Sequence, residues 1–470
     1  MAFLIGGANS AADTGYDIEN SCRFDESSDS SLGITFGTPT EGKAFTLSMW
    51  FKMCEMPNSR AVFGGRSGYE NIFLQDNSMR WDWNNASSGT INWAPKLRDH
   101  SAWYHFVLAQ DTAQSTDTNR AKFYINGTQI TTLRGGTTQT WPAQNLETGY
   151  NQDGVAFYLS SYNGTAGNVT AYYSEVAFID GLQYAASVFG ETNDDGIWIP
   201  KEFKDDVTFG NNGFYLEFKQ SGTGTNASGL GADTSGEDNH LVVGGLAAVD
   251  QCTDTPTNNF CVLNAINPTE ANAGFTEGNL IFKNTLNSSP HHGLAHGTMA
   301  VAKGKWYWEV RVDAIGGTAM GIGAEEVSAF GKNNVAGNQG ISLFNHGYTH
   351  QRGSDVAVSG GTTYTTNDII GVALDMDNRK IYFHKDGTYF NSGDPTSGAT
   401  GTGAISLNAA DVTMTPAVSN YNTGIQNCNF GNPQWTVSST QADDAGYGNF
   451  EYDVPAGYYA LCTKNLAEYG

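Results

Sequence analysis

The residues best suited to binding chemistry lie in and around the run MRWDWNNASSG at positions 79–89. On a β-strand its two tryptophans would share one face, and the acid and amide that alternate with them would share the other. Indole rings stack on the apolar faces of sugars, while carboxylates and amides bond to sugar hydroxyls. The candidate glycan-binding residues are Tyr69, Trp81, Asp82, Trp83, Asn84 and Trp93. The alternative is that Trp81 and Trp83 belong to a hydrophobic core.

The sequence offers no clear catalytic constellation. Glycoside hydrolysis needs two carboxylates across a cleft, often presented as alternating acids on one strand. Glu325 and Glu326 are adjacent, so they would face opposite ways, while Asp375 and Asp377 alternate but fit a turn. Composition leaves a Ser-His-Asp triad open, yet no G-x-S-x-G elbow, P-loop or dinucleotide fingerprint occurs. We expect no enzymatic activity.

Metal ligands are also sparse. The histidines of SPHHGLAHG (His291, His292 and His296) sit in a glycine-broken stretch, which favours a solvated loop over a metal site. Asp/Asn loops such as 193–195 (Asn193, Asp194 and Asp195) leave calcium as a weak alternative, but no dense ligand run occurs. The six cysteines form no C-x-x-C pair, and we expect thiols. No cofactor is predicted.

The charge balance excludes two classes of partner. The 470-residue chain has 24 basic and 48 acidic residues, a formal net charge of −24. No Lys/Arg cluster is present to bind nucleic acid or an anionic membrane surface. No secretory signal and no apolar run of about 18 residues is evident, so we expect a protein made in a cytoplasm without membrane insertion.

Two similar sequence segments predict the secondary-structure elements that hold these residues. AKFYINGTQI at 121–130 and RKIYFHKDGTYF at 379–390 alternate apolar and polar residues around Asn-Gly or Asp-Gly. Such pairs suit two-residue hairpin turns. Each phrase has an aromatic-rich strand upstream, at 45–52 and 304–312. No long helical periodicity occurs. The predicted fold is all-β, with two jelly-roll-like β-sandwiches in series.

Four segments are predicted from changes in amino-acid composition along the chain. The first is an apolar arm at residues 1–12, with no partner strand in evident reach. A sandwich at 13–204 and a Gly/Ser-rich connector at 205–265 follow, and a second sandwich fills 266–470.

The strands carry a family resemblance. FTLSMWFK, AWYHFVLAQ, AKFYINGTQI and YYSEVAFIDG resemble successive strands of a laminin-G-like, concanavalin A-like jelly roll. GKWYWEVRV, IIGVALDMDNRKIYFHKDGTYF and NCNFGNPQW resemble a SPRY domain, a bent sandwich that binds proteins. The junction DTPTNNFCVLN and the tail GYYALCTKNL are similar to virion proteins of tailed phages, especially marine ones.

This resemblance implies a structural virion protein. The leading expectation is a tail fibre, or receptor-binding adhesin, that recognises host surface glycans or envelope components. The alternative is a head fibre or capsid decoration protein that binds other capsid proteins, and a glycan depolymerase is a third possibility. The implied partners are other virion proteins and a host receptor, in a homo-oligomer for which a trimer is favoured.

Two groups of residues are candidates for contact with protein partners. The first is in the stretch NHGYTHQRG of the second sandwich, and the second is the apolar arm, which would be exposed on a monomer. The residues are Tyr348, His350, Arg352, Phe3, Leu4 and Ile5.

Deleting residues 2–12 tests the role of the arm. If the arm docks the protein or joins it to copies of itself, the shortened chain should fold normally but fail to enter particles. Quantitative mass spectrometry of purified particles measures this, and unchanged incorporation would contradict the hypothesis.

Overall fold

A computed structural model describes residues 4–5, 15–55, 58–65, 70–83, 89–136, 139–266, 273–284, 293–323, 340–351, 354–357, 363–409, 411–420 and 422–470. The chain forms two compact units. The N-terminal unit comprises residues 13–257, and the C-terminal unit comprises residues 258–470 together with the first strand of the chain. Within the described ranges, no helix has the length and apolar character needed to cross a membrane.

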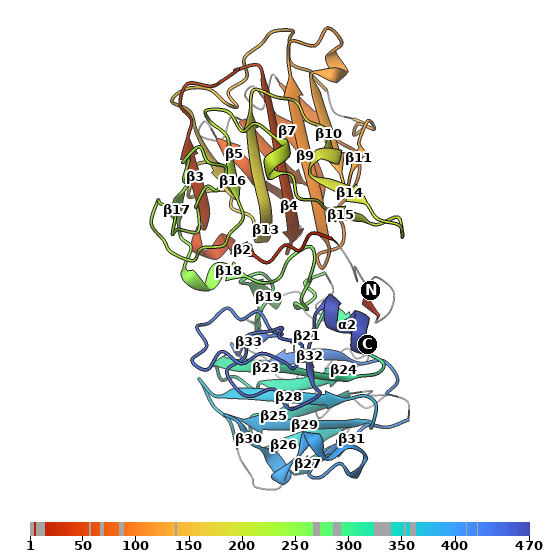
Figure 1. Cartoon of the computed structure of the whole chain (residues 1–470). Helices are drawn as coiled ribbons and strands as arrows, with labels where there is room; N and C mark the ends of the chain where they lie inside the picture. The colour runs from red at the N-terminus through yellow and green to blue at the C-terminus, as the bar shows by residue number, and fades with distance from the viewer. Residues whose placement is uncertain are drawn as a thin grey trace. The chain divides into compact units, whose positions relative to one another are not determined.

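The N-terminal unit consists of two antiparallel sheets and a small two-stranded sheet of β14 (Gly190–Thr192) and β15 (Trp198–Pro200) (Figure 1). The eight-stranded sheet has the order β11 (Thr128–Gln129), β10 (Ala121–Ile125), β9 (Trp103–Asp111), β4 (Ala44–Met53), β13 (Ala171–Asp180), β2 (Ser21–Phe24) and β18 (Gln251–Cys252), with β16 (Phe214–Leu216) paired to β13. The seven-stranded sheet has the order β17 (Val242–Gly244), β3 (Ser31–Thr35), β12 (Ala156–Leu159), β5 (Asn58–Gly65), β6 (Glu70–Gln75), β7 (Ser78–Asp82) and β8 (Thr90–Asn92).

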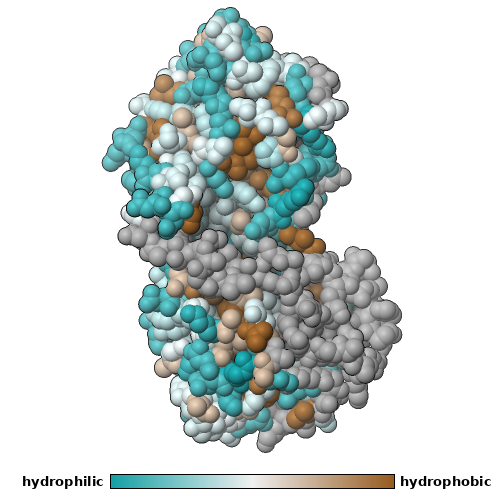
Figure 2. All heavy atoms as spheres, turned by 90° about the vertical axis from the view of Figure 1, so that its right-hand side faces the viewer, coloured by the Kyte–Doolittle hydropathy of each residue, from teal (hydrophilic) through white to brown (hydrophobic). Residues whose placement is uncertain are grey.

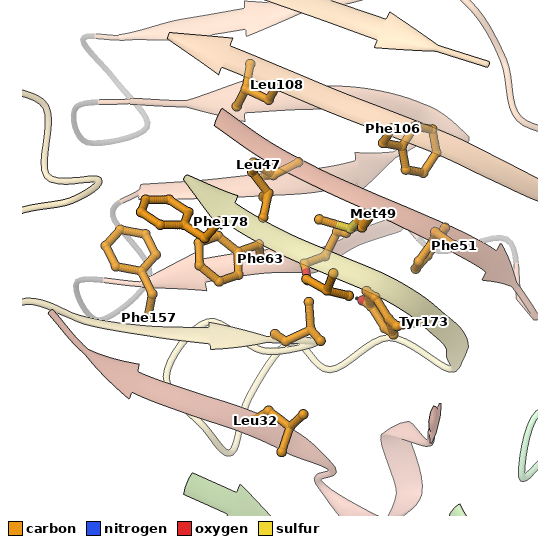
Figure 3. Close-up of a cluster of buried hydrophobic side chains, with 14 of the residues drawn as sticks. Leu32, Leu47, Met49, Phe51, Phe63, Phe106, Leu108, Phe157, Tyr173 and Phe178 are labelled. Carbon is orange, nitrogen blue, oxygen red and sulfur yellow. Dashed lines mark hydrogen bonds between the residues drawn. The ribbon is translucent and has the colours of Figure 1, made fainter. Parts of the chain in front are cut away.

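Aromatic and aliphatic side chains from both sheets fill the space between them. Figure 3 shows side chains of β4, β9 and β13 pointing toward those of β3, β5 and β12. The rings of Phe63 and Phe157 stack with centroids 5.3 Å apart. Since strand side chains alternate, burying one face of each strand directs the intervening residues to the outside of the sandwich.

The boundary of this unit lies later in the chain than the sequence predicts. Residues 205–257, predicted as most of a connector, contribute β16, β17 and β18 to the two sheets. A fully buried ion pair reinforces this association, because Lys52 Nζ on β4 lies 2.7 Å from Asp254 Oδ2. The Gly/Ser/Thr-rich composition of the segment therefore reflects turns between short strands.

The C-terminal unit is also a two-sheet sandwich (Figure 1). The nine-stranded sheet has the order β19 (Ala273–Thr276), β20 (Ile281–Asn284), β33 (Ile425–Asn429), β23 (Lys305–Ala314), β28 (Ile369–Asp375), β29 (Lys380–Lys385) and β30 (Thr388–Tyr389), with β31 (Ile405–Ser406) on β29 and β34 (Tyr459–Ala460) on β23. The six-stranded sheet has the order β21 (Gly293–His296), β32 (Thr415–Asn420), β24 (Ala319–Gly323), β25 (Gly340–Phe344), β26 (Tyr348–Gln351) and β27 (Ser354–Ala357).

Helical structure in the described residues is short. The α-helix α2 (Thr463–Tyr469) follows β34 near the C-terminus. Short 3₁₀ segments occur at η1 (Glu26–Ser28), η3 (Asp117–Asn119), η4 (Ala186–Val188), η5 (Lys204–Asp206), η6 (Ala248–Asp250), η7 (Phe390–Ser392) and η8 (Pro395–Thr400). The prediction of an all-β chain with two sandwiches is confirmed.

Both predicted hairpins are confirmed. β10 and β11 are joined by Asn126 and Gly127 with φ of 46° and 75°. β29 and β30 are joined by Asp386 and Gly387 with φ of 48° and 81°. Positive φ at both central positions is the signature of the tight turn that these residue pairs favour.

The N-terminal arm has a partner strand in the chain, contrary to the expectation. β1 (Leu4–Ile5) pairs in parallel with β22 (Met299–Ala300) of the C-terminal unit. Two extended residues suffice for this pairing, which the sequence pattern does not reveal. Phe3 lies outside the described residues, and the role of Leu4 and Ile5 in binding another chain stays a prediction.

Candidate functional site

The three tryptophans proposed for sugar stacking are core residues. Trp81, Trp83 and Trp93 are 0%, 5% and 2% exposed. Trp93 stacks on Phe123 with ring centroids 4.3 Å apart, and the Trp83 indole N–H donates to the Thr140 carbonyl at 2.7 Å. The prediction of an exposed tryptophan platform is therefore wrong, because this side of β7 faces the opposite sheet. Tyr69 and Asn84 lie outside the described residues.

The polar residues of β7 lie on the other face, as the alternation in MRWDW predicts for Asp82. Directly opposite residues in antiparallel pairs share a face, so strand register defines a row across five strands. The row runs from Thr90 through Asp82, Asn71 and Gly64 to Tyr158. Gly64 is required at its centre, because a Cβ there would lie 2.3 Å from Asn71 Oδ1.

Asp82 anchors this row from a buried position. Its Oδ1 accepts hydrogen bonds from Arg80 Nε at 2.8 Å and from Thr90 Oγ1 at 2.7 Å. Its Oδ2 has no partner among the described residues. Burial raises the pKa of Asp82, and the two hydrogen bonds oppose that rise. Asp82 thus acts through Arg80 and Thr90, since it has no exposed surface of its own.

Arg80 presents the charge that Asp82 holds in place. Its Nη1 donates to Gln75 Oε1 at 3.2 Å, and its guanidinium carbon lies 5.5 Å from the centre of the Phe73 ring. The Arg80 side chain is 20% exposed. Three contacts therefore fix the orientation of a partly exposed guanidinium group.

A half-buried tyrosine completes this surface. Tyr162 packs edge-to-face on Phe73 with centroids 5.3 Å apart, and its hydroxyl donates to the Ser59 carbonyl at 3.0 Å. We call the set Phe73, Gln75, Arg80, Asp82, Thr90 and Tyr162 the β6–β8 outer face. It combines a partly exposed ring, a guanidinium group, an amide and a hydroxyl, which is the chemistry that sugar recognition uses.

Sequence reasoning missed Arg80, Thr90 and Tyr162. The signal for Arg80 is present in MRWDW, because it shares the period-two alternation with Asp82. Tyr162 has no such signal, since it comes from the loop after β12 and reaches Phe73 only through the tertiary fold.

Among the described residues, one serine hydroxyl bonds to a histidine ring, but the proton on that ring is placed unsuitably for catalysis. Ser48 Oγ lies 2.9 Å from His105 Nε2, and Trp198 Nε1 donates to His105 Nδ1 at 3.1 Å. Burial lowers the pKa of His105 to about 3, so the ring is neutral. Nδ1 accepts from an indole that can only donate, so Nε2 carries the proton and donates to Ser48. The histidine therefore cannot serve as a base toward this serine.

Glu175 in the N-terminal unit is a buried acid whose hydrogen bonds connect neighbouring segments of the fold. Burial, with nearby Glu217 adding to it, raises its pKa to about 8. Glu175 lies in a bulge of β13 with φ of 49° and accepts hydrogen bonds from the hydroxyls of Tyr16 and Tyr215. These bonds connect the segment before β2 and strand β16 to β13.

Glu309 in the C-terminal unit has a similar role. It accepts from the backbone N–H groups of Glu451 and Tyr452 at 3.0 and 2.9 Å and from the Tyr307 hydroxyl at 3.1 Å. The Tyr307 hydroxyl also bonds to His384 Nε2 at 2.7 Å. Burial raises the pKa of Glu309 to about 7. This network attaches the segment around Glu451 to the nine-stranded sheet.

The remaining candidates do not assemble into a metal or catalytic site. Asp375 accepts from the Asn378 N–H and stabilises the turn after β28 as expected, while Asp377 accepts from the Gly304 N–H and connects this turn to the segment before β23. His296 is 3% exposed, while His291, His292, Glu325 and Glu326 lie outside the described residues. Asn193 Oδ1 accepts from the N–H groups of Asp195 and Ile197, forming a turn. Across the described ranges, no group of three His, Cys, Asp or Glu residues could hold a metal. All six cysteines are buried thiols.

The proposed contact residues of the C-terminal unit divide between surface and core. Tyr348 is 44% exposed at the start of β26 and packs edge-to-face on His346 at 5.4 Å. His350 is 3% exposed, so its predicted contact role is wrong, because the ring is buried near Phe344, with centroids 6.2 Å apart, and almost none of it is accessible to a partner. Arg352 lies outside the described residues.

Family models match both units. Residues 26–176 match the concanavalin A-like lectin/glucanases superfamily model Laminin_G_3, and residues 305–431 match the SPRY domain model. The chain carries a concanavalin A-like domain followed by a SPRY domain. No curated protein matches the chain.

Solved structures add only distant likenesses. The SPRY domain of human HERC1 is 14% identical, with a TM-score of 0.27 over 35% of this chain and 96% of that chain. Stonustoxin is 16% identical, with a TM-score of 0.27 over 36% and 27%. A candidate carbohydrate-binding protein from Bacteroides ovatus is 11% identical, with a TM-score of 0.31 over 44% and 53%. At these TM-scores the likenesses carry no functional argument.

The burial of Trp81 leads to a stability prediction. Trp81→Ala should lower the free energy of unfolding of the N-terminal unit by about 3–5 kcal/mol, because it empties a core position. Arg80→Ala, one residue away on the opposite face, is the matched control and should cost less. Denaturant unfolding followed by tryptophan fluorescence measures both, and an unchanged midpoint for Trp81→Ala would contradict the core assignment.

The Glu309 network predicts a pH dependence of the C-terminal unit. The pKa of Glu309 rises from 4.5 to about 7 on folding, so its stabilising effect is complete below pH 4.5 and is lost as the pH rises through about 7. Relative to Glu309→Gln, the wild-type protein should lose on the order of 3 kcal/mol across this window. Calorimetry at several pH values checks this, with the exposed Glu468→Gln as control. Parallel pH profiles of wild type and Glu309→Gln would contradict the assignment.

Proposed function

We propose that this protein is a non-enzymatic adhesin that binds glycans through the β6–β8 outer face of its concanavalin A-like domain. The observation that carries the proposal is the arrangement of Arg80, which Asp82, Gln75 and Phe73 hold in one orientation beside the half-buried ring of Tyr162. A fixed guanidinium group beside an aromatic ring binds sugar hydroxyls with little loss of side-chain entropy. The match to a lectin/glucanase superfamily supports the same class of ligand.

The surface of the protein supports a polar mode of binding. Figure 2 shows hydrophobic residues in small separate patches among hydrophilic ones on the coloured part of the face it presents. The exposed large hydrophobic residues of the described chain are scattered: Leu182, Val242, Ile266, Ile315, Tyr348, Val356 and Val412. A protein that binds through hydrogen bonds and single rings needs no broad apolar surface.

Binding without cleavage is part of the proposal. The Ser48–His105 pair has the wrong tautomer for a nucleophile and base, and Glu175 and Glu309 are engaged in separate structural networks. Release of reducing sugar from a bound glycan would overturn this part and favour a depolymerase.

The setting that we propose is the virion of a tailed phage, with the protein as a tail fibre that carries the concanavalin A-like domain to the host surface. The resemblance of the junction and tail sequences supports this setting. The exposed Tyr348 of the SPRY domain is the proposed contact for other virion proteins. Labelling the protein on intact particles tests the assignment, since a position on the capsid would favour the alternative of a head fibre or decoration protein.

Glycan binding is tested with the full chain on an array of bacterial surface glycans. Arg80→Ala and Tyr162→Ala should each weaken binding about tenfold, or about 1.4 kcal/mol, because each removes one direct contact. Lys122→Gln on β10 of the other sheet is the control and should bind as wild type. Absence of binding to every glycan, or wild-type binding by both site variants, would refute the proposal.

A further inference from the structure

We propose that the β6–β8 outer face selects glycans bearing a carboxylate or sulfate group, by means of a cationic cluster formed by Arg80, Lys96 and Arg134. This inference rests on the proposed function and specifies its ligand class. Three positive side chains gather around one hairpin end in a chain with only 24 basic residues.

Arg80 supplies a donor that points away from its own supports. Nε is bonded to Asp82 and Nη1 to Gln75, while Nη2 makes no hydrogen bond to a described residue. A guanidinium group held at one edge and open at the other suits the planar geometry of a carboxylate or the oxygens of a sulfate.

Arg134 lies at the same end of the β6–β7 hairpin and comes from a different segment of the chain. Its backbone N–H donates to the Asn92 carbonyl at 2.9 Å, and Asn92 is the register partner of Arg80. Leu133 packs against the core, so the next residue is directed outward. Arg134 Nη2 donates to Asp76 Oδ2 at 2.6 Å, and its side chain is 32% exposed.

Lys96 closes the cluster at the β6–β7 turn. Its Nζ donates to the Asp76 backbone carbonyl, and the residue is exposed. The neighbouring Leu97 N–H donates to the Asn77 carbonyl at 2.7 Å, so the segment after β8 is bound to this turn. The three cations therefore lie near the β6–β7 turn and come from β7, from the segment after β8 and from the segment beside Asn92.

The charge balance identifies the occupant. Among the described residues, Asp82 pairs with Arg80 and Asp76 pairs with Arg134, while Lys96 bonds to a backbone carbonyl, so the ion pairs of the described chain leave Lys96 without a carboxylate partner on a chain of net charge −24. Repulsion by the rest of the surface would disfavour an anionic ligand elsewhere on the molecule. An acidic polysaccharide chain provides single anionic groups at regular intervals, so one sugar can place its charge at this end of the hairpin while its neighbours contact Tyr162.

The test compares three short oligosaccharides of equal length, one neutral, one uronate-containing and one sulfated, binding to the full chain in titration calorimetry. Wild type should bind at least one acidic probe about tenfold more tightly than the neutral one, with the preference reduced at high salt. Arg134→Gln should lose this preference, because Arg134 adds charge beside the sugar contacts, and should retain the neutral affinity. Lys122→Gln should keep the preference. Only variants whose melting temperature matches that of the wild-type protein are compared.

Each outcome separates the inference from the proposed function. Equal affinity of wild type for neutral and acidic probes, or an acidic preference that survives in Arg134→Gln, overturns the inference while glycan binding stands. Tight binding of a single-stranded DNA oligonucleotide that is lost in Arg134→Gln also overturns it, because the cluster would then recognise charge without sugar. Absence of binding to all three oligosaccharides and to the glycan array refutes the proposed function itself.

Discussion

The packing of aromatic side chains between the two sheets of the N-terminal unit is the constraint on which the proposed site depends. Trp81 is fully buried, and Phe63, Phe157 and their neighbours form the ring-lined interior around it. Because side chains alternate along β7, burying Trp81 forces Arg80 and Asp82 to the outside. A register shift of one residue would bury the Arg80 guanidinium group and expose the Trp81 indole. No other packing in the core would compensate for that loss of stability. The outer face is thus a consequence of the inner one.

Buried polar groups hold the segments of each unit together. The Lys52–Asp254 pair is fully buried and joins β4 to the last segment of the N-terminal unit, while Glu309 bonds to the backbone around Glu451 in the other unit. Removing one partner of such a group leaves the other desolvated and unpaired, so these contacts specify where the closing segments lie. This division leaves the partly exposed Arg80 and Tyr162 for binding.

The sequence predicts the architecture better than the site, for identifiable reasons. Asn126-Gly127 and Asp386-Gly387 encode their turns locally, so the hairpins are predictable from a few residues. Alternation in MRWDW correctly separates the tryptophans from Asp82, but it does not tell which side packs against a second sheet. That choice depends on partners such as Phe123, distant in sequence from Trp93. The strands of residues 205–257 are only two or three residues long, too short for a period-two signal.

The proposed function requires that an oligosaccharide binds on the β6–β8 outer face. The most direct measurement is a structure of the full chain with a bound acidic oligosaccharide. We expect a sugar oxygen within hydrogen-bond distance of Arg80 Nη2 and a sugar ring in contact with Tyr162. A sugar bound on the eight-stranded sheet, or in the SPRY domain, with the β6–β8 outer face empty, would contradict it.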